Sequence, residues 1–83
     1  MSTPVDELMD AYLEWCEESG AVAFAYRRWS SAPTEDAAGA FAAYVAALDR
    51  EERASAEYAR LFMRARAARS RDRRVREWLG EAA

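Results

Sequence analysis

Hydrophobic side chains recur at gaps of three and four residues along the second half of the chain. This spacing matches the 3.6-residue turn of an α-helix and does not match the alternation of a β-strand. The stretch contains no proline, and Gly39 is its only glycine. The pattern therefore predicts one long amphipathic helix over about residues 35–69. Its hydrophobic positions are Phe41, Tyr44, Val45, Leu48, Tyr58, Leu61 and Phe62.

An earlier helix is predicted over about residues 4–29. Thr3 and Pro4 suit the N-cap and the first helical position, and Asp6 can complete a capping box with Thr3. The three-and-four spacing continues across Gly20, so we expect one helix, with a kink at Ser19–Gly20 as the alternative. The positions expected to face the second helix are Val5, Leu8, Tyr12, Trp15, Ser19, Val22, Tyr26 and Trp29.

Residues 30–34 form the turn between these helices. Pro33 disfavours a helical conformation at Ala32, and Thr34, which two acidic residues follow, is a typical helix start. A connection this short makes the helices antiparallel neighbours. The sequence therefore predicts an all-α fold, in which residues 1–83 form a single helical domain built on an antiparallel two-helix hairpin.

The two predicted helices differ in length. If the turn centres near residue 32, Val5 lies level with about Ala59, and the residues after Leu61 have no first helix beside them. A straight helix over residues 62–79 would project on the order of 25 Å into water. Exposed large hydrophobic side chains in such a projection are unfavourable, because burying one is worth about 1.5–3 kcal/mol.

The hydrophobic side chains of the C-terminal segment 71–79 are therefore expected to be buried against another part of the protein or a second copy. This segment either continues the second helix or folds back as a short third helix between a cap at Ser70 and a stop at Gly80. A second copy of the chain could cover it instead, and we expect this homodimer, arranged as a four-helix bundle. The expected interface residues are Leu61, Phe62, Val75, Trp78 and Leu79.

Charge is distributed unevenly along the chain. Residues 1–57 carry 12 acidic residues against 4 Arg, whereas residues 58–83 carry 8 Arg against 3 acidic residues. An Arg-rich helix can bind phosphate groups. The overall charge of -3 instead favours a solvated helix face that pairs with the acidic first half. The candidate contacts for an anion or nucleic acid are Arg64, Arg66, Arg69, Arg71, Arg73, Arg74 and Arg76.

The residue types of common catalytic and metal sites are scarce. The chain contains no His and no Lys, and Cys16 is its only cysteine. Zinc sites lose their usual ligands, and no His is available to activate the Cys16 thiol. No Gly-rich phosphate-binding loop occurs either. We therefore expect no enzymatic activity, no cofactor and no metal.

The remaining patterns concern location and role. No apolar run approaches the roughly 20 residues of a membrane span, and no signal-peptide pattern is present at the N-terminus. We therefore expect a cytoplasmic protein that does not contact membranes. The favoured function is a small protein-interaction module that self-associates and docks on a larger protein. The alternative is a nucleic-acid-binding protein that uses the Arg-rich segment 64–76.

Overall fold

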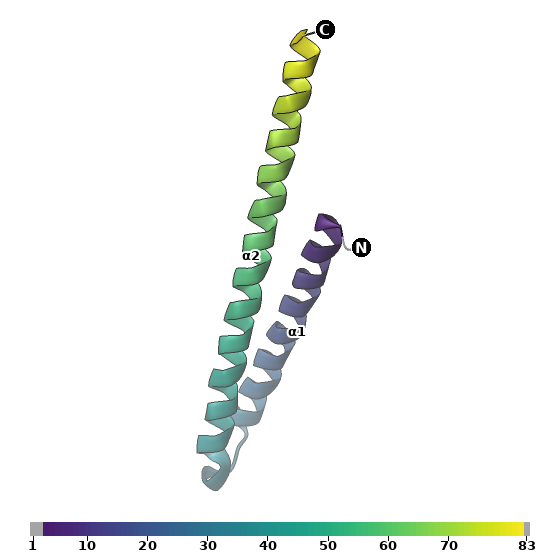
Figure 1. Cartoon of the computed structure of the whole chain (residues 1–83). Helices are drawn as coiled ribbons and strands as arrows, with labels where there is room; N and C mark the ends of the chain where they lie inside the picture. The colour runs from purple at the N-terminus through teal and green to yellow at the C-terminus, as the bar shows by residue number, and fades with distance from the viewer. Residues whose placement is uncertain (1–2, 83) are drawn as a thin grey trace.

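The protein is an antiparallel helical hairpin with arms of unequal length. The computed structural model describes residues 3–82, and the side chains of residues 3–80. It contains α1 (Pro4–Ser30), a short 3-10 helix η1 (Thr34–Asp36) and α2 (Ala37–Ala82). No strand occurs in this described part of the chain. Figure 1 shows α1 lying along the first half of α2, so the predicted all-α hairpin is confirmed.

The start of α1 follows the predicted capping box. The Thr3 hydroxyl accepts a hydrogen bond from the Asp6 N–H at 3.0 Å, and the Asp6 carboxylate accepts one from the Thr3 N–H at 3.2 Å. Pro4 occupies the first turn, where its missing N–H leaves no hydrogen bond unmade. The helix passes Gly20 without a break, so it is one helix from Pro4 to Ser30.

The turn differs from the prediction at the start of the second helix. Thr34 does not act as the N-cap, because it already lies inside η1, and Pro33 takes the capping position without a side-chain hydrogen bond. The Asp36 N–H instead donates to the Pro33 carbonyl at 2.9 Å. One turn of 3-10 helix thus leads the chain from the fixed φ of proline into α2.

Every second residue that was predicted to lie on the α2-facing side of α1 is exposed instead. Leu8, Trp15, Val22 and Trp29 are half-buried as expected, but Tyr12 and Tyr26 are 43% and 52% exposed. Ala11 and Ala25, each one residue before these tyrosines, are buried in their place. Their small side chains allow the two helix backbones to approach closely. The residues of α1 that face α2 are Leu8, Ala11, Trp15, Glu18, Val22, Ala25 and Trp29.

The facing surface of α2 alternates small and large residues in the same way. Ala47 is 0% exposed, and the buried hydrophobic residues among those described are Ala11, Ala25, Ala47 and Ala54. Between these alanines, the indole N–H of Trp15 donates to the Glu51 carboxylate at 2.7 Å. The residues of α2 that face α1 are Ala40, Tyr44, Ala47, Glu51, Ala54, Tyr58, Leu61 and Ala65.

The second helix continues far beyond the first. It runs unbroken through Ser70 and Gly80 to Ala82, so the alternative in which residues 71–79 fold back as a third helix is wrong. Residues 66–80, which we call the overhang, extend about 22 Å past the end of α1 (Figure 1). The radius of gyration is 20.3 Å, against about 12 Å for a compact chain of this length. The predicted length mismatch is confirmed.

Candidate interaction surfaces

One side of the hairpin, which we call the apolar face, carries a second row of hydrophobic and small residues. On each helix this row lies one residue after the row that faces the other helix, and it keeps the three-and-four spacing. Apart from Ser55, which is half-buried, its residues are exposed. The row on α1 is Val5, Met9, Tyr12, Cys16, Ser19, Ala23 and Tyr26, and the row on α2 is Phe41, Val45, Leu48, Glu52, Ser55, Ala59 and Phe62.

Aromatic contacts place the two rows on the same side of the hairpin. The rings of Tyr12 and Tyr58 lie 5.8 Å apart, and those of Tyr58 and Phe62 lie 6.2 Å apart. At the turn end, Tyr26 lies 5.7 Å from Tyr44. Hydrogen bonding to the Cys16 side chain, one turn along, raises the pKa of the Tyr12 hydroxyl above its ordinary value. Glu52 is the one charged residue of the apolar face.

The opposite side, which we call the charged face, carries ion pairs. The Arg50 guanidinium lies 3.2 Å from the Glu18 carboxylate and joins α2 to α1. Arg60 donates to Glu57 at 3.0 Å along α2. This hydrogen bond lowers the pKa of the Glu57 carboxyl and raises that of the Arg60 guanidinium. Exposed pairs of this kind contribute little to stability.

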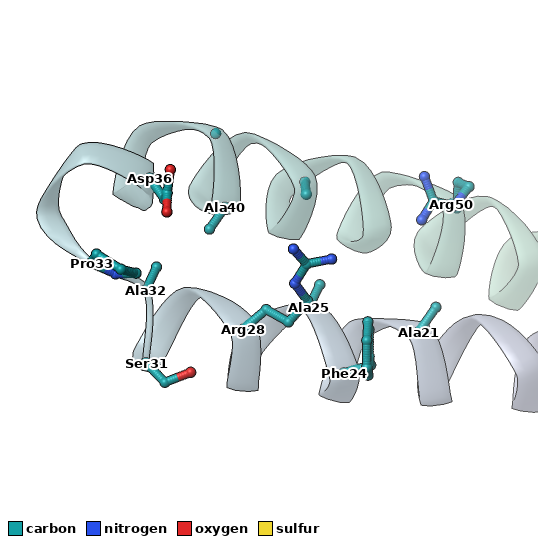
Figure 2. A pocket seen from close by; sticks show the side chains of 12 residues that line it. Ala21, Phe24, Ala25, Arg28, Ser31, Ala32, Pro33, Asp36, Ala40 and Arg50 are labelled. Atoms are coloured by element: carbon teal, nitrogen blue, oxygen red, sulfur yellow. The ribbon is translucent and has the colours of Figure 1, made fainter.

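A shallow groove of about 720 Å³ opens on the charged face beside the turn. Figure 2 shows the Arg28 side chain reaching from α1 across this groove toward α2. The Arg28 guanidinium also lies 6.0 Å from the centre of the Phe24 ring. Half of the residues that line the groove are alanine or glycine, and its charged residues are Arg28, Asp36 and Arg50.

The Arg-rich segment divides into two sets. Four side chains spaced three, four and three residues apart line one shallow groove on the overhang, together with Ser70 and Asp72. Asp72 pairs with one of them, Arg76. The sequence prediction treated all seven arginines as one cluster, but helical spacing separates them. The groove is lined by Arg66, Arg69, Arg73 and Arg76, whereas Arg64, Arg71 and Arg74 lie outside it.

The structure does not bring the five predicted interface residues together. Leu61 is half-buried beside α1, and Phe62 lies on the apolar face next to Tyr58. Val75 and Leu79 continue the α1-facing row of α2 beyond the end of α1. Trp78 is 65% exposed. The prediction overlooked the apolar face, although a second three-and-four row offset by one residue was readable in the sequence.

Other classes of site find little support in residues 3–82. Within this range, no three His, Cys, Asp or Glu side chains gather in a way that could hold a metal ion. No helix within it combines the length and hydrophobicity needed to cross a membrane.

The fold and surfaces define an all-α helical hairpin with one apolar face, one charged face and an Arg-rich overhang. Comparison with protein-family models, with curated proteins and with solved structures gave no match.

Proposed function

We propose that this protein is a small, non-enzymatic interaction module that self-associates and also docks on a larger protein. One observation carries the proposal. Among the described residues the buried hydrophobic side chains are four alanines, whereas fourteen large hydrophobic residues, from Val5 to Leu79, are exposed. This distribution is the reverse of that expected for an independent domain, whose largest hydrophobic residues lie inside.

The energetic balance supports the same proposal. Burying one large hydrophobic side chain stabilises a protein by about 1.5–3 kcal/mol, and small domains often need a second subunit to gain enough of this burial. A disulfide within one chain is excluded here, because Cys16 is the only cysteine. A homodimer is the simplest arrangement that removes several of these side chains from water at once.

The first prediction is that the purified chain is a dimer. Sedimentation equilibrium at micromolar concentrations should give a mass twice the monomer mass of 9.4 kDa. The melting temperature should also rise with protein concentration, because association stabilises the folded chain by mass action. A monomer at every concentration up to several hundred micromolar, with a melting temperature independent of concentration, would contradict the proposal.

A second candidate function is nucleic-acid binding through the overhang. It rests on the groove lined by Arg66, Arg69, Arg73 and Arg76, which places four guanidinium groups along one side of an exposed helix. The overhang carries six Arg against two acidic residues, so its local charge is positive although the whole chain is acidic. Such a row suits the phosphate backbone of a nucleic acid rather than the edges of its bases.

For this candidate we predict binding to duplex DNA that weakens steeply with salt. Four phosphate contacts give a slope of about −3.6 in a plot of log K against log salt, which fluorescence anisotropy can measure between 50 and 200 mM salt. Replacing the four groove arginines by Gln should abolish binding. Replacing Arg64, Arg71 and Arg74 by Gln is the matched control and should reduce it less. Absence of binding at the lowest salt removes this candidate.

A further inference from the structure

We infer that a second copy of this chain docks on the apolar face, antiparallel to the first, about a twofold axis that passes beside Cys16 and Glu52. This inference rests on the proposed self-association and specifies its surface and orientation. In this arrangement α1 packs on α1 and α2 packs on α2 of the second copy, and the product is a four-helix bundle with antiparallel neighbours.

The order of residues in the α1 row is the first argument. Cys16 is the fourth of its seven members. When a second copy is inverted about Cys16, Tyr12 lies opposite the second copy's Ser19, and Met9 lies opposite the second copy's Ala23. Large side chains therefore meet small ones, which is the alternation that lets two helix faces interdigitate.

The α2 row has the same property. Glu52 is the fourth of its seven members. Inversion about Glu52 sets Leu48 opposite the second copy's Ser55, and Val45 opposite the second copy's Ala59. On either side of its central residue, each row thus sets large side chains opposite small ones. Only the outermost residues of each row, Val5 with Tyr26 and Phe41 with Phe62, set two large side chains opposite each other.

The two centres of inversion lie at nearly the same height in the hairpin. The hydrogen bond from Trp15 to Glu51 places these two residues side by side. Because the helices are antiparallel, the next residues, Cys16 and Glu52, are separated by about 3 Å along the axis. A single axis perpendicular to the helices can therefore serve both rows at once. Each centre then lies within about 1.5 Å of that axis, measured along the helices.

The overhang decides between the two possible twofold arrangements. A parallel dimer also sets large residues of one row opposite small residues of the other. It would, however, place both overhangs at one end of the bundle, each with its row of four arginines. The antiparallel dimer sends the two overhangs to opposite ends, beyond the Debye length of about 8 Å over which such charges repel. Repulsion between the two overhangs, each with six Arg, therefore favours the antiparallel form over the parallel one and opposes the smaller repulsion of one pair of Glu52 carboxylates beside the axis.

The area available is sufficient for a stable dimer. The rows span about 32 Å along the helix axes, and the structure is 20 Å across its second dimension. Contact over this patch covers roughly 640 Å² on each copy, or about 1,300 Å² in total, within the range of specific interfaces. Inversion about Glu52 also sets Arg66 and Arg69 beside the second copy's η1 and the start of its α2. The rest of each overhang, including Trp78, extends past the second copy's α2 and remains accessible to the larger partner of the proposed function.

Cys16 is a natural reporter for this orientation. In the antiparallel dimer the two Cys16 thiols lie beside the axis, and a short bis-maleimide should join them by adding one thiol across each C=C bond. In a parallel dimer Cys16 faces the second copy's Glu52, and this product should not form. The matched control carries C16S together with A43C, which places the thiol on the charged face, and should give less than a tenth of the covalent dimer.

Two substitutions on α2 complete the test. Leu48→Glu should weaken the dimer at least tenfold in sedimentation equilibrium, whereas Ala46→Glu, exposed but outside the apolar face, should leave it unchanged. Glu52→Gln should tighten the dimer several-fold, because only the antiparallel form brings the two Glu52 carboxylates together. A dimer that resists Leu48→Glu, lacks the Cys16 product or ignores Glu52→Gln overturns this inference alone. A monomer at every concentration overturns the proposed function as well.

Discussion

Replacing Trp29 by Ala should lower the free energy of unfolding by about 3 kcal/mol. The Trp29 ring lies 4.9 Å from that of Phe41 and stacks on Tyr44 at 5.5 Å, so it joins α1 to α2 directly beside the turn. Few other large side chains hold this end of the hairpin together, because the neighbouring inner positions are Ala25 and Ala40. For a chain of this length the melting temperature should fall by more than about 10 °C.

The measurement is a circular dichroism melt at a fixed protein concentration, because dimer formation makes the melting temperature depend on concentration. Trp78→Ala is the matched control. It removes the same side chain from the overhang, where Trp78 is 65% exposed, and should leave the melting temperature within about 2 °C. Equal losses in the two variants would show that the cluster at Trp29 does not stabilise the hairpin.

Replacing Ala47 by Leu should destabilise the hairpin by up to about 3 kcal/mol. Ala47 is 0% exposed, the lowest value among the buried alanines, so its side chain is fully enclosed between the two helices. A larger side chain has no free volume to enter, so α1 and α2 must separate locally and lose contacts that include the Trp15 hydrogen bond to Glu51. Urea unfolding followed by circular dichroism at 222 nm can measure the loss.

Ala46→Leu is the control for this substitution, because Ala46 precedes Ala47 on the same helix and is exposed. Leucine and alanine have similar helix propensities, so the control should change stability by less than about 0.5 kcal/mol. If Ala47→Leu proves as stable as the control, the tight packing of Ala47 between the two helices is incorrect.

The features that the sequence predicted well are those that depend on neighbouring residues. The capping box of Thr3 and Asp6 formed as expected, because all its groups lie within one turn. The turn at Pro33 and the unequal helix lengths followed from local propensity and from counting residues. The continuation of α2 through Ser70 and Gly80 remained open, because their turn signals compete with strong helix formers on either side.

The candidate surfaces were harder to predict. Tyr12 and Ala11, or Tyr26 and Ala25, are adjacent in sequence, and either member of each pair fits a three-and-four spacing. Large aromatic residues usually lie in protein cores, so Tyr12 and Tyr26 were predicted to face the second helix. In the structure both are exposed. The groove formed by four of the arginines needs a long helix that extends past its neighbour, so it could be described only once that helix was known to be continuous.

The amino-acid sequence is enough to specify a helical hairpin with a long, Arg-rich second arm. Capping, periodicity and proline act within a few residues, and they suffice to set where each helix starts and which arm is longer. The row of each helix that lies inside is set instead by the packing of the two helices against each other. That choice depends on how closely two backbones can approach, and the alanines allow an approach that the tyrosines would prevent. The neighbouring row on each helix, one residue further along, therefore remains exposed and forms the apolar face.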